Sequence, residues 1–253
     1  MSHPAYPLLG RVAVILGGTG GIGAATARRY AAAGARVAVV ASRDAARARD
    51  LAAALPAVEG GHAGFAAAID QTHELVALAA AVRGGLGPAS ILVNSAGTTR
   101  AIPHGDLDAL DDATFDRILA VNTRGAFAAI RSFAPDLRAG GNGLVVNVSS
   151  IAATTAVGSS IAYCASKAGL DVLGACLARA LAPAIRVMTV SPGVVDTDFV
   201  PGRDKAASDK LAATTPLKRI ATPDDVAHAI LACATSLAFS TGSIIQVDGG
   251  RHL

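Results

Sequence analysis

A tyrosine and a lysine four positions apart, Tyr163 and Lys167, are the pair in this chain best suited to acid–base chemistry. They lie in a predicted helix, residues 162–181, where side chains at positions i and i+4 share one face. A phenol ordinarily ionises near pH ~10, and a nearby cation lowers its pKa because it favours the phenolate. Bringing that pKa to about 7 takes about 4 kcal/mol, which a lysine and a positively charged cofactor could supply together. The spacing alone also suits an ordinary surface pair, so the surrounding motifs decide the interpretation.

The composition indicates a large apolar core and narrows the possible partners. Of the 253 residues, 52% are hydrophobic and 16% are charged, which favours a folded chain over a disordered one. The net charge is +3 and no run of Lys or Arg stands out, so neither nucleic acid nor a membrane surface is an expected partner. Residues 1–10 lack the regions of a signal peptide, and no apolar run reaches the ~18 residues of a membrane span.

The cysteines point to a reducing compartment. Cys164, Cys176 and Cys233 lie far apart and form no Cys-x-x-Cys motif, which is typical of reduced thiols in a cytoplasmic protein. No cluster of His, Cys and Glu suggests a metal site, so none is expected.

A glycine-rich turn follows the first predicted strand, residues 11–16. Gly17, Gly21 and Gly23 lie in this turn, and a helix-forming run at residues 24–33 comes next. In a strand–turn–helix unit, such glycines permit a tight turn, a close approach of backbone to a pyrophosphate, and close packing of helix on strand. The first N–H groups of the helix then face the anion. The order of elements therefore predicts a dinucleotide site, and the absence of a Gly-Lys-Ser/Thr motif argues against a triphosphate P-loop.

The end of the second predicted strand, residues 36–41, bears on which dinucleotide binds. It is followed by Ser42 and Arg43, with no carboxylate before Asp44. A carboxylate here would hold a ribose 2′-hydroxyl, whereas an arginine beside a hydroxyl suits a 2′-phosphate, so NADP(H) is favoured over NAD(H). Asp44 is expected to cap a helix at residues 45–55. Asp70 ends a strand at residues 65–69, and either contacts an adenine amino group or caps a helix at residues 72–83.

The whole chain alternates between predicted strands and helices, with seven strands and about six helices. This pattern predicts an α/β protein with a doubly wound Rossmann fold: a seven-stranded parallel sheet covered by helices on both faces. Polar or small residues end the strands, and in such sheets ligands bind beyond the carboxyl ends. We expect residues 1–253 to form a single dinucleotide-binding and catalytic domain, with a lid segment at about residues 199–215. A long helix at residues 111–137 is interrupted by Asn122 and Gly125. The remaining strands are expected at residues 90–93, 143–148, 185–190 and 243–247.

Taken together, these motifs resemble those of the short-chain dehydrogenase/reductase family, particularly members of the 3-oxoacyl-carrier-protein reductase kind. The match runs from about residue 10 to residue 250. Two positions depart from the family's pattern: Leu16 replaces a threonine before the glycine turn, and Ser95 replaces the second asparagine of an Asn-Asn-Ala-Gly motif. The motifs are the glycine turn, Asn94-Ser95-Ala96-Gly97, Asn147-Val148-Ser149-Ser150, Tyr163-x-x-x-Lys167, Ser191-Pro192-Gly193 with Thr197, and Asp248-Gly249-Gly250.

The resemblance implies a role for each residue. Tyr163 is the general acid in reduction and the base in oxidation, and Lys167 lowers its pKa and holds the nicotinamide ribose. Ser150, rather than Ser149, hydrogen-bonds the substrate oxygen, and Asn122 holds a water that links Lys167 to solvent. The implied catalytic set is Asn122, Ser150, Tyr163 and Lys167. The implied cofactor-binding set is Gly17, Thr19, Gly21, Ile22, Ser42, Arg43, Asp70, Asn94, Ala96, Gly97, Tyr163, Lys167, Pro192, Gly193, Val195 and Thr197.

The expected function is therefore an NAD(P)(H)-dependent oxidoreductase that interconverts a ketone and a secondary alcohol by hydride transfer. Its partner would be a small carbonyl or alcohol substrate, and family resemblance implies a homotetramer. A catalytically silent cofactor-binding sensor or scaffold of the same fold is the alternative. A bare nucleotide-binding domain is a third possibility, but it gives no reason for Tyr163 and Lys167 to follow a serine-ended strand.

Overall fold

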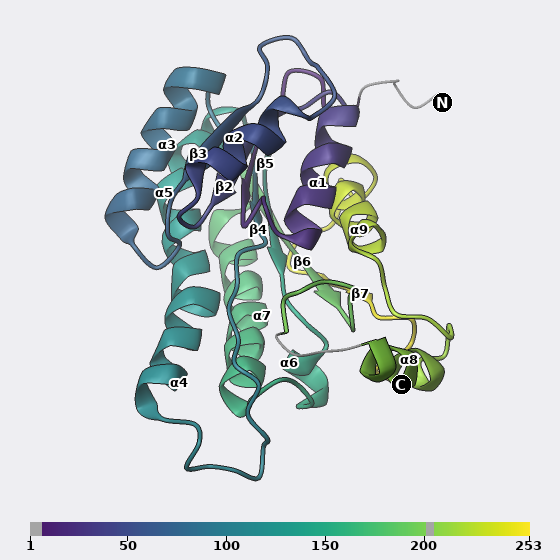
Figure 1. Ribbon diagram of the computed structural model, residues 1–253. Helices are drawn as coiled ribbons and strands as arrows, with labels where there is room; N and C mark the ends of the chain where they lie inside the picture. Colours follow the sequence, from purple (N-terminus) through teal and green to yellow (C-terminus); the bar gives the residue numbers. More distant parts are fainter. Residues whose placement is uncertain (1–6, 201–204) are drawn as a thin grey trace.

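The computed structural model describes residues 7–200 and 205–253, and these build one seven-stranded sheet (Figure 1). Every neighbouring pair of strands is parallel, and the order across the sheet is β3-β2-β1-β4-β5-β6-β7. The predicted doubly wound parallel sheet is thereby confirmed. The strands are β1 (Val12–Leu16), β2 (Arg36–Ala41), β3 (Ala63–Ala66), β4 (Ile91–Asn94), β5 (Gly143–Val148), β6 (Ile185–Pro192) and β7 (Ile244–Val247).

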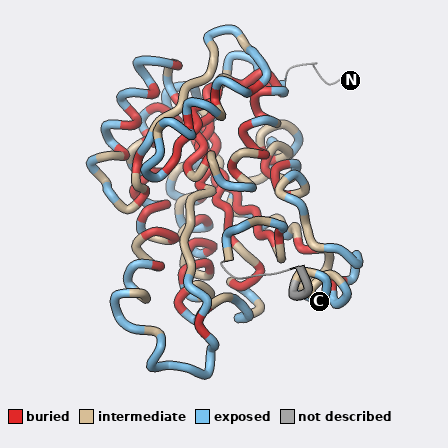
Figure 2. Tube along the Cα trace, in the orientation of Figure 1, coloured by how far each residue is buried: buried red, intermediate tan, exposed pale blue. Residues whose placement is uncertain are grey.

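Two apolar layers cover the sheet, one on each face. Side chains from α1, α2 and α9 pack with one face, and side chains from α3, α5 and α7 pack with the other. The central strands are therefore buried on both sides, while the outer faces of the helices stay exposed (Figure 2). The helices are α1 (Gly21–Ala32), α2 (Ala45–Ala53), α3 (Thr72–Leu86), α4 (Asp112–Leu119), α5 (Gly125–Ala139), α6 (Ala152–Thr155), α7 (Ile161–Leu181), α8 (Lys205–Thr214) and α9 (Pro223–Thr235).

Most element boundaries agree with the sequence predictions to within three residues, and β2 and β5 agree at both ends. Asp44 caps α2 as predicted, since its carboxylate accepts from the N–H of Arg47 at 2.9 Å. The predicted cap at Asp70 is wrong: α3 begins after Gln71, which provides no side-chain cap in the described structure. The lid segment at residues 199–215 contains α8, and residues 201–204 of that segment lie outside the described residues.

Three predicted elements need correction. The helix expected at residues 111–137 is divided by a π-helical turn, Ala120–Arg124, which contains Asn122. The helix expected to begin at residue 24 begins at Gly21, because the last glycines of the turn adopt helical backbone. The strand expected at residues 65–69 is Ala63–Ala66, since this edge strand pairs only with β2 and leaves it after Ala66.

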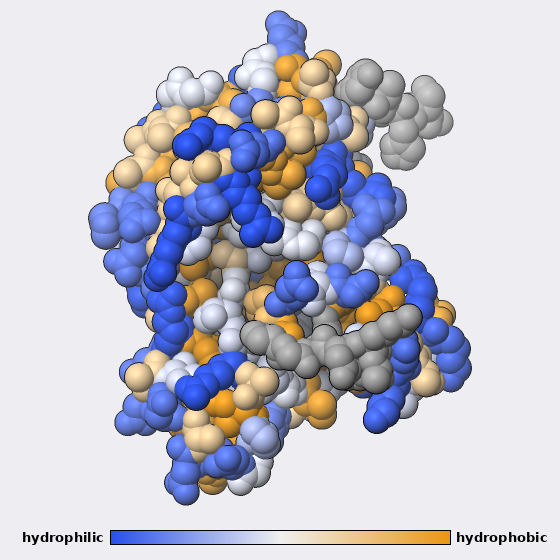
Figure 3. All heavy atoms as spheres, in the orientation of Figure 1, coloured by the Kyte–Doolittle hydropathy of each residue, from blue (hydrophilic) through white to orange (hydrophobic). Residues whose placement is uncertain are grey.

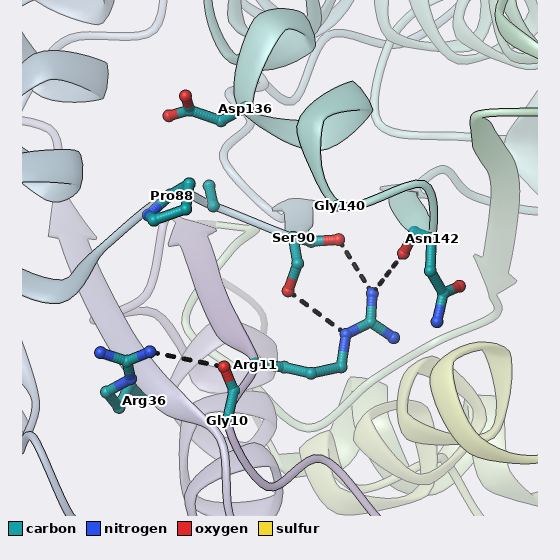
Figure 4. A pocket seen from close by; sticks show the side chains of 9 residues that line it. Gly10, Arg11, Arg36, Pro88, Ser90, Asp136, Gly140 and Asn142 are labelled. Carbon is teal, nitrogen blue, oxygen red and sulfur yellow. Dashed lines mark hydrogen bonds between the residues drawn. The ribbon is translucent and has the colours of Figure 1, made fainter.

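The amino-terminal edge of the sheet is held together by Arg11. Its guanidinium donates to the hydroxyl and carbonyl of Ser90 and to the carbonyl of Asn142 (Figure 4). A cavity of about 310 Å³ adjoins this arginine. The guanidinium joins the segments that enter β1, β4 and β5, so we assign this edge a structural role.

Helix α7 is long and apolar enough to cross a membrane, judged by length and composition alone within the described residues. Its inward stripe nevertheless buries polar groups, Lys167 and Asp171 among them, against the sheet. It also packs closely along β6. These contacts make α7 a core helix of the α/β fold.

Candidate active site

The glycine turn after β1 forms a cradle that only glycine backbone permits. Gly17 has φ of +73°, and a Cβ added to it would lie 2.7 Å from the backbone nitrogen of Ala96. A Cβ on Gly23 would lie 2.2 Å from the Gly17 carbonyl oxygen. Helix α1 starts here with Gly20 at its N-cap, and no side-chain cap occupies its first N–H groups in the described structure. Free N–H groups at a helix start attract anions, so the cradle fits the pyrophosphate of a dinucleotide.

The segment after β6 covers this cradle from the other side. A Cβ on Gly21 would lie 2.5 Å from the Cγ2 atom of Thr197, so the two residues are in direct apposition. Val195 forms an isolated bridge with Ala221, which fixes the path of the segment. Gly193 donates its N–H to the carbonyl of Val247 at 3.0 Å, as part of the sheet edge. Of the cofactor residues predicted at the end of β6 and beyond it, Thr197 thus meets the glycine turn after β1.

A second part of the edge is a cavity of about 390 Å³ beyond the ends of β2 and β3. It brings together Ser42, Arg43 and Asp70, all predicted as cofactor residues. Arg117 of α4 also lines it and forms an ion pair with the Asp70 carboxylate. Sequence reasoning did not find Arg117, because the ion pair joins residues that are 47 positions apart.

Arg47 is another residue of this region that sequence reasoning missed. Its guanidinium donates to the carbonyl oxygen of Thr19, in the glycine turn, at 3.2 Å. Its place in the first turn of α2, close behind Ser42 and Arg43, was the available signal. Figure 3 shows hydrophilic side chains gathered over α2 and the carboxyl ends of β1 and β2. A basic side chain thus spans the gap between α2 and the phosphate cradle.

The predicted catalytic hydroxyls meet at the carboxyl end of β5. Ser150 hydrogen-bonds the phenol of Tyr163 and lowers its pKa, while its own Oγ accepts from the N–H of Ala152 at 3.2 Å. Ser149 points to α7, where its hydroxyl lies 3.4 Å from the Lys167 carbonyl oxygen. Tyr163 is therefore close to Ser150, whereas Ser149 is directed to α7.

Lys167 is buried beside the tyrosine. Its Nζ lies 5.8 Å from the centroid of the Tyr163 ring and donates to the carbonyl oxygen of Val148 at 2.8 Å. Burial lowers the pKa of Lys167 to about 8, and the charge of Asp171 opposes that change. A buried lysine whose pKa lies near neutral pH is characteristic of functional sites.

The pKa of Tyr163 differs from the expectation. Burial raises it to about 12, and the hydrogen bond from Ser150 only partly offsets that. The expected lowering by Lys167 is absent among the described groups, because the ammonium points to the Val148 carbonyl. The protein alone thus keeps the phenol protonated at neutral pH. Whether a bound cofactor lowers this pKa stays a prediction.

Asn122 holds the loop after β4 against α7. Its amide oxygen accepts from the N–H of Thr98 at 2.8 Å, and its Nδ2 donates to the Thr98 carbonyl at 3.0 Å and the Ser166 hydroxyl at 2.9 Å. The Ser166 hydroxyl donates in turn to the carbonyl of Tyr163 at 2.8 Å. The Asn122 side chain therefore positions these segments, with both N–H groups and one lone pair of its amide in use.

The remaining predicted residues lie in the same loop and at the same edge. Asn94 ends β4 and donates to Asn147 of β5 at 2.8 Å, which joins the two strands below the site. Gly97 lies beside Asn122 and the Phe199 ring, where an added Cβ would make contacts of 3.4 and 3.7 Å. The Phe199 ring also meets the ring of Tyr163, with centroids 6.0 Å apart.

The parallel sheet and the glycine cradle at its carboxyl edge define a Rossmann-type dinucleotide-binding protein. Residues 17–252 match the family model described as enoyl-(acyl carrier protein) reductase. The chain belongs to the short-chain dehydrogenase/reductase family, and it is an oxidoreductase that uses NAD or NADP.

Similar proteins cover almost the whole chain. One, named ketoacyl reductase 2 of the granaticin polyketide synthase from Streptomyces violaceoruber, is 39% identical over 96% of both chains. D-threitol dehydrogenase from Mycolicibacterium smegmatis is 38% identical over 97% of this chain and 94% of its own. A solved structure of a short-chain dehydrogenase/reductase of the glucose/ribitol dehydrogenase type from Brucella melitensis is 28% identical, covers 99% of this chain and 100% of its own, and has a TM-score of 0.91.

Proposed function

We propose that this protein interconverts a ketone and a secondary alcohol, with Tyr163 as the general acid and base and with NADP(H) favoured over NAD(H). The observation that carries this proposal is the position of Tyr163 beside both Ser150, which acts on the pKa of the phenol, and the buried Lys167. A hydroxyl that donates a proton, a second hydroxyl and a cation are the groups that stabilise charge growing on a carbonyl oxygen. A catalytically silent sensor would have no use for this combination.

The cofactor supplies or accepts the hydride, and the protein's own residues handle the proton and the position of the substrate. In reduction, Tyr163 gives its phenolic proton to the substrate oxygen, and Ser150 donates a hydrogen bond to the same oxygen. The raised pKa of Tyr163 keeps the phenol in the protonated form that reduction needs. Without cofactor, Lys167 does not offset the raised pKa of Tyr163. In this proposal its charge, held between the tyrosine ring and the end of β5, favours the phenolate once the cofactor is bound.

The glycine cradle and the segment after β6 are the residues that would hold the cofactor. At Gly17, Gly21 and Gly23 an added Cβ would collide with neighbouring protein atoms, so only glycine permits this tight turn. The N–H groups at the start of α1, which no side chain caps in the described structure, would face a pyrophosphate. The cavity with Ser42, Arg43 and Asp70 would take the adenosine end. Thr197 lies against Gly21, in a position to contact the nicotinamide side of the dinucleotide.

Side chains near the phenol favour an uncharged substrate. The ring of Phe199 is 40% exposed while it contacts Tyr163. Exposed apolar groups beside a catalytic phenol suit a carbonyl compound with an apolar or neutral body. The names of the relatives include both a ketoacyl reductase and a polyol dehydrogenase, so either substrate class fits.

The test is NADPH oxidation followed at 340 nm against a panel of ketones. The panel should include 3-oxoacyl thioesters, cyclic ketones, small diketones and ketoses. Turnover of at least one ketone, with the corresponding alcohol as product, is the expected result. Tight binding of cofactor with no turnover across the panel would favour the sensor instead.

The cofactor preference can be tested at Arg43 and Arg47. Arg43 lines the adenosine cavity and Arg47 reaches the Thr19 carbonyl, so both can contribute charge to a ribose 2′-phosphate. We expect each change to alanine to raise KM for NADPH by about tenfold, equivalent to about 1.4 kcal/mol, and to leave KM for NADH within about twofold. Arg49→Ala is the control, because Arg49 is exposed on the same helix. Equal losses for both cofactors would contradict the preference for NADP(H).

We also propose a homotetramer in a reducing, cytoplasmic setting. The three free cysteines support the location, and exposed Phe127 of α5 and Val172 of α7 support association through the two long helices. We expect Val172→Glu to convert tetramers to smaller species in light scattering coupled to size exclusion. Val76→Glu, at a similarly exposed valine of α3, should leave the mass unchanged. A monomeric wild-type protein would contradict the proposal.

A further inference from the structure

A second buried charge, Asp171, lies one helical turn beyond Lys167 on the inward stripe of α7. The residue is 9% exposed, and neither of its carboxylate oxygens has a partner of normal hydrogen-bond geometry within the described residues. A buried carboxylate is costly unless opposite charge or hydrogen bonds compensate it. Its presence in this stripe therefore calls for an electrostatic explanation.

Among the described residues, Ser149 and Lys167 are the groups that act on the Asp171 carboxylate. Burial raises the pKa of the Asp171 carboxyl group, and the Ser149 hydroxyl of β5 and the charge of Lys167 partly oppose that rise. One turn further on, Gly174 lies against the Thr189 hydroxyl and the Nδ2 atom of Asn147, where an added Cβ would make contacts of 3.0 and 3.4 Å. The sheet thus presents hydroxyls and an amide to this part of α7. Lys167 provides the opposite charge that acts on the carboxylate.

Around Lys167 itself, the titratable neighbours are Tyr163 and Asp171, both on α7. Strand β5 presents the Val148 carbonyl and the Ser149 hydroxyl, which carry no charge. The π-helical turn presents Asn122, also neutral, through Ser166. In the described part of the chain, Asp171 is the carboxylate whose charge raises the pKa of Lys167.

We propose that Asp171 is a positioning residue of the active site: its buried carboxylate, on the side of Lys167 away from the phenol, keeps the lysine protonated and so keeps positive charge beside Tyr163. This proposal rests on the proposed function, since it gives Lys167 the task of favouring the phenolate. Asp171 acts through the lysine and not on the substrate.

The balance of effects on Lys167 explains why a second charge is needed. Burial works against the ammonium and brings the pKa of Lys167 to about 8, even with Asp171 present. The lysine is then mostly protonated at pH 7.5. Loss of the carboxylate should lower this pKa by a further ~1 unit, on the scale of a partly screened charge pair. The protonated fraction at pH 7.5 would fall by about threefold.

The first experiment measures the lysine without requiring turnover. The chain has four lysines, Lys167, Lys205, Lys210 and Lys218, so lysine labelled with ¹³C at Cε gives few NMR signals. Lys167→Arg identifies the signal of Lys167. We expect Asp171→Asn, which is nearly isosteric, to lower the pKa of Lys167 by about 1 unit. An unchanged pKa in Asp171→Asn would overturn the proposal.

Asp136→Asn is the matched control. Asp136 is also a buried aspartate with an unpartnered carboxylate oxygen, but it lies on α5 and pairs with Arg83. Its substitution should leave the titration of Lys167 unchanged, and an equal shift there would overturn the specific role of Asp171.

If Asp171→Asn fails to fold, the wild-type protein still tests the idea. The NMR signal of Lys167 should shift once as Lys167 titrates and again, at lower pH, as the Asp171 carboxyl group titrates. A titration curve with only one step would contradict the proposed interaction between Asp171 and Lys167.

The second experiment links the charge to catalysis. Ketone reduction needs the protonated lysine, so kcat/KM should fall as pH rises through the pKa of Lys167. In Asp171→Asn this fall should move to lower pH by the same ~1 unit, with KM for the cofactor changed less than kcat. A shifted lysine pKa with an unmoved rate profile would overturn the catalytic part. A protein that titrates as expected but reduces no ketone would instead contradict the proposed function.

Discussion

Tyr163→Phe is expected to lower kcat for ketone reduction by about 10³-fold, within the range that general acid catalysis contributes. The change removes one oxygen and leaves the ring that packs against Phe199. The substrate oxygen then loses its proton donor, and Ser150 loses the phenol as its hydrogen-bond partner. Steady-state NADPH oxidation measures the rate, and the fluorescence of the bound nicotinamide measures cofactor affinity. We expect the affinity to stay within about threefold of the wild-type value, because binding of the dinucleotide rests mainly on the cradle.

Tyr30→Phe is the control for this substitution. Tyr30 is fully buried on α1, and its phenol donates to the carbonyl of Ile230 at 3.1 Å. Its replacement should cost about 1 kcal/mol of stability and leave kcat nearly unchanged. If Tyr163→Phe retained most of the wild-type kcat, the proton would have to come from another group, and the proposed mechanism would be wrong.

Local signals in the sequence were sufficient for the framework of the site. Apolar, β-branched runs predicted β2 and β5. Asp44, directly before α2, was correctly predicted as the N-cap of that helix. Ser150 and Tyr163 were assigned from motifs that resemble those of the family, and each lies at the end or start of an element that the sheet places on one edge. Such features depend on neighbours along the chain, and for that reason they are visible without coordinates.

The contacts that tune the site could not be predicted in the same way. The ion pair of Arg117 with Asp70 and the hydrogen bond of Arg47 to Thr19 depend on how α4 and α2 lie against the sheet edge. The π-helical turn contains Asn122, whose amide bonds to both Thr98 and Ser166. Neither partner is near it in sequence.

The pKa of Tyr163 could not be predicted from the local sequence either. Spacing placed a lysine beside the phenol, and that alone predicts a lowered pKa. Burial has the opposite effect, and the ammonium is directed to the Val148 carbonyl, so the raised value results. Desolvation depends on the whole packed environment, which no short motif contains.

Gly23→Ala is expected to damage both the fold and cofactor binding. The new Cβ would lie 2.2 Å from the Gly17 carbonyl oxygen and 2.9 Å from the Gly18 Cα, both rigid backbone atoms. The turn would have to open, at a cost of about 3 kcal/mol, which corresponds to a Tm lower by about 6–12 °C in a protein of this size. Thermal unfolding followed by circular dichroism measures the loss. Opening the turn also misplaces the N–H groups at the start of α1, so NADPH affinity should fall by more than tenfold.

Gly85→Ala tests whether these losses come from the cradle or from any glycine replacement. Gly85 is exposed within α3, and in the described structure its added Cβ would meet nothing within 4 Å. Alanine should stabilise that helix by about 0.5–1 kcal/mol and leave cofactor affinity unchanged. A Gly23→Ala protein with wild-type Tm and wild-type NADPH affinity would mean that the turn can accept a side chain. The close approach of helix to strand would then not be what shapes the phosphate site.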